Sequence, residues 1–105
     1  MKKYIVKVSK LAEKDMESII FYLKNELKED IIADKYKLLF KQELKRLEDI
    51  AKSMPILPKE LAGYENIRKL NVRKYVIFYI IDNDVVYVVR VGHAFMDWEK
   101  YLRDE

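Results

Sequence analysis

The stretch YVIFYIIDNDVVYVVRV, residues 75–91, decides the fold. Two runs of β-branched and aromatic residues flank Asn83-Asp84, a pair that tolerates positive φ, so the stretch predicts two strands joined by a hairpin turn. Residues 75–81 of the first run are apolar on both faces. That composition is typical of a central strand with helices on one side and further packing, or a partner, on the other.

The residues around this hairpin complete a sheet. Residues 67–72 are another short β-branched run, so three strands follow one another as a meander. Near the start of the chain, residues 3–9 place Tyr4, Val6 and Val8 on one face and predict a further strand. Its partner strand stays open at this point. It must join the sheet, because an isolated strand would leave its backbone groups unpaired.

Two helices are predicted between the first strand and the meander. Ser9 is a good N-cap for a helix over residues 9–27, and a second amphipathic stripe runs from Ala33 to Ala51. Neither Gly nor Pro separates the stripes, which favours an antiparallel helical hairpin. A short helix over residues 97–102 is expected to close the chain. The order predicts an α+β fold, with the N-terminal strand and a helical hairpin packed on a mostly antiparallel four-stranded sheet.

The composition of the chain excludes several kinds of protein and site. The 105 residues predict a single domain, 1–105, and with 50% apolar residues, two Gly and two Pro the chain is expected to fold. The absence of Cys excludes disulfides, thiolate zinc sites and cysteine nucleophiles, and one His excludes a multi-histidine metal site. We expect no cofactor and no metal. The apolar run at residues 4–6 is too short for a signal peptide or membrane span, which predicts a cytoplasmic protein without a membrane partner.

Positive charge concentrates in the sheet region, although the net charge is only +3. The candidate binding residues are Arg68, Lys69, Arg73, Lys74 and Arg90. Cations at strand ends attract phosphate oxygens, and Arg does so with planar, bidentate geometry. A nucleic acid, an acidic protein segment and a merely solvated basic face all remain open.

His93 is the single imidazole and lies where the last strand ends. With a pKa near ~6.5 an imidazole exchanges protons at neutral pH, so His93 is a candidate general acid or base. The alternative is a hydrogen-bonded structural histidine. No carboxylate pair, Gly-rich phosphate loop or serine elbow accompanies it, so hydrolase, kinase and nucleotide-binding functions have no support.

Several segments, in order, resemble the RelE/ParE superfamily of toxins from type II toxin-antitoxin systems. The residues that carry the resemblance are Tyr4-Ile5-Val6-Lys7-Val8-Ser9, Ala12, Asp15, Ile19, Ile67-Arg68-Lys69-Leu70, Tyr75-Val76-Ile77-Phe78-Tyr79, Val88-Val89-Arg90-Val91, His93 and Asp97-Trp98. The resemblance implies a bacterial growth-inhibiting toxin that a cognate antitoxin neutralises. Two branches compete: ParE-like poisons of DNA gyrase, and RelE-like endonucleases that cleave mRNA on the ribosome.

The details favour the ParE-like branch. The nuclease pattern commonly has an Arg directly after the tyrosine that opens the central strand, and this chain has Val76 there. Another basic residue commonly follows the last strand, where this chain has Ala94-Phe95-Met96. The segment at His93 also looks more like ParE.

The nuclease alternative implies its own site, as does a third reading of the sequence. If the protein is an mRNA endoribonuclease, the catalytic candidates are His93, Arg68, Arg73 and Tyr101. Arg68 and Arg73 would stabilise the phosphate, while Arg90 would position the substrate. The third reading is a non-toxic α+β module that binds an acidic protein segment. Under either toxin reading, an antitoxin with acidic residues would cover apolar surface that the helical hairpin leaves open.

Overall fold

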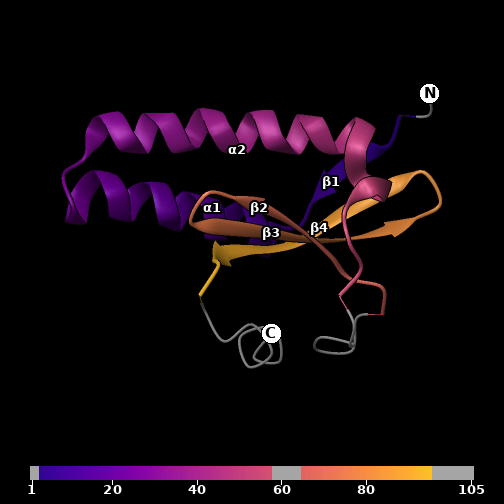
Figure 1. Ribbon diagram of the computed structural model, residues 1–105. Helices are drawn as coiled ribbons and strands as arrows, with labels where there is room; N and C mark the ends of the chain where they lie inside the picture. The colour runs from indigo at the N-terminus through magenta and orange to yellow at the C-terminus, as the bar shows by residue number, and fades with distance from the viewer. Residues whose placement is uncertain (1–2, 58–64, 96–105) are drawn as a thin grey trace.

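A computed structural model describes residues 3–57 and 65–95 (Figure 1). Two helices lie side by side on one face of a four-stranded sheet. In chain order the elements are β1 (Ile5–Val8), α1 (Lys10–Phe21), a π-helical turn η1 (Tyr22–Glu26), α2 (Asp30–Ile50), a 3₁₀ turn η2 (Ala51–Ser53), β2 (Arg68–Val72), β3 (Tyr75–Asp82) and β4 (Val85–His93). The predicted α+β order and helical hairpin are confirmed. The predicted closing helix at residues 97–102 lies outside the described residues.

The sheet has the strand order β1-β4-β3-β2. The meander pairs are antiparallel, whereas β1 runs parallel to β4, with Val8 opposite Val88. The sheet is therefore mixed, and its single parallel pair is the one whose partner the sequence left open. β3 lies between two neighbours, so the prediction of a central strand is also confirmed.

The start of α1 is fixed by the predicted N-cap. The Ser9 hydroxyl accepts a hydrogen bond from the Ala12 backbone N–H at 3.0 Å and donates one to the Val89 carbonyl at 2.9 Å. One side chain thus satisfies a free amide of the first helical turn and ties the helix to β4. α1 therefore begins beside the second half of β4.

Apolar side chains on both faces of the sheet are buried. Toward the helices, Tyr75, Ile77 and Tyr79 of β3 pack with Phe40 and Leu47 of α2. On the opposite face a smaller cluster contains Ile67, Val76 and Phe78. The two-sided burial of β3 explains why its sequence shows no alternation of polar and apolar residues.

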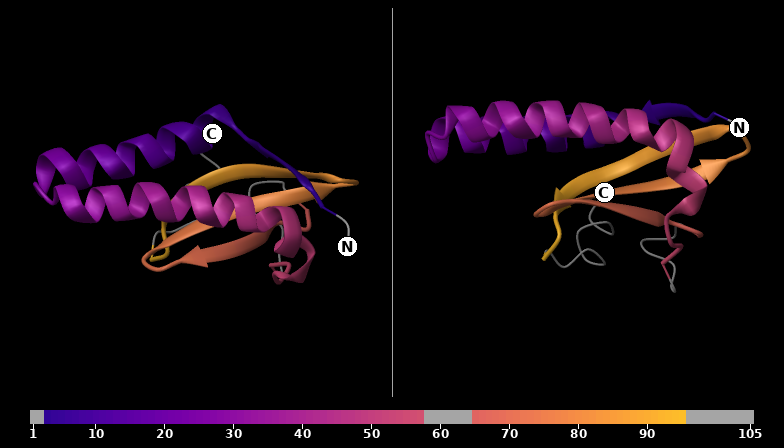
Figure 2. Two further views of the ribbon diagram at one scale, coloured as in Figure 1. Left: turned by 90° about the horizontal axis from the view of Figure 1, so that it is seen from above. Right: turned by 45° about the horizontal axis from the view of Figure 1, so that its top comes forward.

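The helical hairpin is longer than the sheet beneath it. Seen from above and in the oblique view, the ends of α1 and α2 that meet at their connection project past the turn between β2 and β3 (Figure 2). Apolar residues there are not covered by the sheet: Phe21 and Ile31 are 61% and 74% exposed. The overhang creates the recess that forms the candidate site.

Candidate functional site

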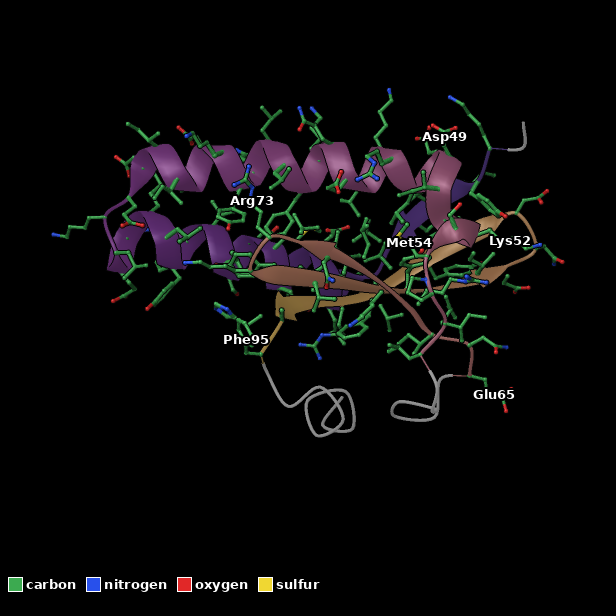
Figure 3. All side chains as sticks on the ribbon, in the orientation of Figure 1. Asp49, Lys52, Met54, Glu65, Arg73 and Phe95 are labelled. Atoms are coloured by element: carbon green, nitrogen blue, oxygen red, sulfur yellow. The ribbon has the colours of Figure 1, made fainter. Side chains whose placement is uncertain are left out.

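Three of the predicted basic residues meet at one end of the sheet, below the overhanging helices. His93 ends β4 directly opposite Tyr75, the first residue of β3. The Ala94 N–H donates to the Lys74 carbonyl at 2.9 Å, which fixes the end of β4 against the turn between β2 and β3. Arg73 lies in this turn, close to α2 in projection (Figure 3). Arg73, Lys74 and His93 line one groove of ≈790 Å³.

A cluster of aromatic rings forms the inner wall of this groove. The rings of Tyr75 and His93 lie 4.8 Å apart between centroids, and Tyr36 of α2 meets Tyr75 edge to face at 5.0 Å. Tyr75 is buried, and that burial raises the pKa of its hydroxyl, with smaller contributions from Tyr36 and Tyr22. This phenol therefore stays neutral at physiological pH. His93 itself is exposed to solvent.

Arg68 belongs to the other end of the sheet. Its guanidinium donates to the Lys52 carbonyl at 3.1 Å and to the Met54 carbonyl. Figure 3 shows Lys52 and Met54 after the end of α2, well away from Arg73. Arg73 lies five positions after Arg68 along the extended backbone of β2, a span of ~16 Å. Arg68 stabilises the carbonyl groups that follow α2, as basic side chains do at helix C-termini.

Arg90 is held inside the protein by a carboxylate of α1. Its guanidinium makes two hydrogen bonds to Asp15, at 2.8 and 2.9 Å, and each side chain of the pair is only 10% exposed. The same carboxylate accepts the Val91 N–H at 3.0 Å. Asp15 therefore neutralises a buried cation and satisfies a backbone amide of β4. This geometry gives Arg90 a structural role.

Of the remaining predicted residues that the structure describes, Lys69 does not line the groove. Lys69 is half-buried and pairs with Phe78 across the strands, on the face that points away from Arg68. Tyr101 lies outside the described residues. Within residues 3–57 and 65–95, no three histidine or acidic side chains gather as a metal site requires. In the same residues, neither helix has the length and apolar character needed to cross a membrane.

Sequence reasoning missed two features of this region. The link between Arg90 and Asp15 was not predicted, although a charge inside the apolar run at residues 85–91 signals that a partner must exist. The groove wall from η1 and α2 was also missed. Its signal is a set of apolar residues that fall outside the stripes predicted to face the core, such as Ile32 and Leu38.

The buried hydroxyl of Tyr79 gives a testable dependence of stability on pH. This hydroxyl donates to the Ala51 carbonyl at 2.6 Å. Burial raises its pKa to about 12, against the opposing effect of Arg68. The pKa of Tyr79 in the folded protein exceeds its ordinary value of 10.0. The contribution of the neutral hydroxyl to stability is therefore complete below pH 10 and is lost as the pH rises toward 12. In that window we expect the free energy of unfolding to fall by about 1.4 kcal/mol per pH unit.

Denaturant unfolding at increasing pH, with Tyr79→Phe as the test variant, measures this effect. Below pH 10 the variant should be about 1 kcal/mol less stable than the wild type, because the Ala51 carbonyl loses its donor. Above pH 10 the difference should shrink. Tyr87→Phe, at a partly exposed tyrosine of β4, is the matched control and should follow the wild type. If the free energies of unfolding of Tyr79→Phe and the wild type change with pH in parallel, the hydroxyl is not buried as described.

Comparison with known proteins agrees with this arrangement. The family model for the ParE toxin of the type II toxin-antitoxin system parDE matches residues 6–98. The chain belongs to the ParE toxin family. The resemblance to the RelE/ParE superfamily is thereby confirmed. No curated protein sequence matches the chain.

Two of the solved structures that share the fold of this ParE-family chain come from toxin-antitoxin systems. One is the chromosomal ParDE toxin-antitoxin system from P. aeruginosa, with 17% identity and a TM-score of 0.69, covering 87% of this chain and 96% of that one. The other is the toxin-antitoxin complex RelBE2 from Mycobacterium tuberculosis, with 22% identity and a TM-score of 0.55, covering 87% and 98%. In both cases the likeness is one of fold.

Proposed function

We propose that this ParE-family toxin inhibits bacterial growth by acting on DNA gyrase, and that a cognate antitoxin neutralises it in the cytoplasm. The observation that supports gyrase as the target is that both strand arginines, Arg68 and Arg90, already bind other groups of the protein. Arg90 is paired with Asp15, and Arg68 binds the carbonyls after α2. A poison that acts through surface binding needs neither residue to touch a substrate.

An mRNA endonuclease would place different demands on the same residues. Attack by a ribose 2′-hydroxyl needs a group that removes its proton, a cation that stabilises the phosphate, and a group that protonates the leaving oxygen. Arg73 and His93 line one groove and supply a cation and a proton carrier. Arg68 lies a strand length away. The cluster is therefore incomplete among the described residues, but it makes mRNA cleavage the alternative to test.

Replacement of His93 by alanine separates the two functions. We expect growth inhibition on induction of His93→Ala to match the wild type within about twofold, because the imidazole is exposed and a gyrase poison that acts by surface binding has no proton-transfer step that needs it. A nuclease that used His93 for proton transfer would lose about 10²–10⁴-fold of its rate. Growth curves after induction measure the outcome, with thermal unfolding of the purified variant as the check on folding. A folded His93→Ala protein that no longer inhibits growth would contradict the proposal.

A further inference from the structure

A second recess lies in the seam between the two helices, which run side by side (Figure 2). We call it the seam pocket; it is formed by residues 16–25 of α1 and η1 and residues 37–44 of α2. Each described residue that lines it belongs to one of these helical segments, so it is separate from the groove at the end of the sheet. Its volume is ≈570 Å³. Sites for small molecules commonly measure about 300–1,000 Å³.

The floor of the seam pocket is apolar. Met16 and Ile20 contribute to it from α1, and Phe40 and Leu44 from α2. Each pair is spaced by four residues, so it lies on one face of its helix. Phe40 is buried, whereas Met16, Ile20 and Leu44 are only half-buried. A ligand chain placed between the helices would therefore cover apolar surface that the helices leave in contact with water.

The rim of the seam pocket is basic. Lys24 of η1 and Lys37 and Lys41 of α2 lie around it, against one carboxylate, Glu17. All three lysines are exposed. Within the part of the chain that the structure describes, none of them forms an ion pair with a carboxylate. Lys37 and Lys41 are one helical turn apart and can reach the same head group. A ligand that fits both floor and rim therefore combines an apolar chain with negative charge.

The length of the seam pocket favours a small molecule over a partner helix. From Lys37 to Leu44 its wall on α2 spans ~10 Å, about two helical turns. A docked helix longer than this wall would run past it and meet exposed charged residues at both ends, Asp34 and Lys45. A single short alkyl chain ends within the wall and avoids them.

We propose that the seam pocket binds a free fatty acid. The alkyl chain lies over Met16, Ile20 and Leu44, and the carboxylate faces Lys37 and Lys41. The head group is assigned to the α2 side because Glu17 on α1 repels a second carboxylate. This binding site does not depend on the target of the toxin, so the proposal stands apart from the proposed function.

Calorimetric titration of the full-length protein with octanoate, decanoate and decanol tests the proposal, each ligand being kept below the concentration at which it aggregates. Decanoate should bind about tenfold or more tightly than octanoate, because each methylene that enters the pocket contributes about fourfold. Decanol has the same chain without the charge. It should bind about fivefold or more weakly than decanoate, because hydrogen bonds between charged groups are the stronger ones.

Two double variants test the role of the rim. Lys37→Gln/Lys41→Gln should weaken the binding of decanoate by about tenfold and leave that of decanol unchanged, because only the carboxylate needs the two ammonium groups. The control Lys14→Gln/Lys45→Gln removes the same charge at exposed helix positions outside the pocket. It should bind decanoate within about twofold of the wild type. Equal weakening in both variants would overturn the proposal.

The methionine methyl groups locate the bound chain by nuclear magnetic resonance. Met16 lies in the floor of the pocket, whereas Met54 follows η2 and lies outside it. Decanoate should shift the methyl resonance of Met16 and leave that of Met54 in place. This measurement on the wild type keeps the test valid if the double variants fail to fold.

Three results would contradict the fatty-acid site. One is the absence of binding, and another is decanol binding as tightly as decanoate. The third is a shift confined to the methyl groups of Leu38 and Leu39, which line the groove at the end of the sheet. Binding to vesicles of anionic phospholipid without any binding of free decanoate would also overturn the proposal and would assign the lysines to a membrane surface.

Discussion

Replacement of Asp15 by alanine is expected to lower the free energy of unfolding by about 3–5 kcal/mol. The variant leaves the guanidinium of Arg90 buried without the carboxylate that makes two hydrogen bonds to it, and it also removes the acceptor of the Val91 N–H. The total free energy of unfolding of a small domain is about 5–15 kcal/mol. The change is therefore large enough to leave a substantial part of the protein unfolded at physiological temperature. Urea unfolding monitored by circular dichroism measures it.

A double variant shows how much of this loss comes from leaving the charge of Arg90 buried without its carboxylate. Asp15→Leu together with Arg90→Met replaces both charges by apolar groups of similar size, which removes the uncompensated charge. We expect this protein to be more stable than Asp15→Ala, although the Val91 N–H still lacks its acceptor. A loss of less than about 1 kcal/mol for Asp15→Ala, the range of exposed ion pairs, would mean that the pair is not buried as described.

Truncation of Leu47 is expected to have the next largest effect. Leu47 of α2 is fully buried in the cluster between the helices and the sheet. Leu47→Ala should lower the free energy of unfolding by about 2–5 kcal/mol through lost burial and the cavity that remains. Leu38→Ala, on the same helix but 57% exposed, is the matched control and should change stability by less than about 1 kcal/mol. Equal effects at the two positions would contradict the packing of α2 on the sheet.

Most of the fold follows from local features of the sequence. The period of residues 3–9, the Ser9 cap and the Asn83-Asp84 turn each specify their element through nearest neighbours in the chain. The run at residues 75–81 identifies the central strand, because a strand that is covered on both faces is apolar throughout. The parallel pairing of β1 with β4 lay beyond such reasoning. It joins residues about eighty positions apart and depends on how the helical hairpin crosses the sheet.

The candidate site was less predictable because it depends on partners that are distant in sequence. The sequence indicates that Arg68, Arg73 and Arg90 are cations in the sheet region. It does not indicate that Arg68 turns toward the carbonyls after α2 or that Arg90 meets Asp15. The groove arises because the helices extend past the end of the sheet (Figure 2). This can be seen only once the helices and the sheet are placed relative to one another.

The most direct test of the proposed function runs the purified protein in two assays side by side: supercoiling of relaxed plasmid by DNA gyrase, and integrity of mRNA in a translating ribosome mixture. The Asp15→Ala protein, destabilised but otherwise identical, serves as the control for folding. The proposed function predicts inhibited supercoiling with intact mRNA. Cleaved mRNA with normal supercoiling would contradict it and would assign Arg73 and His93 to an active site.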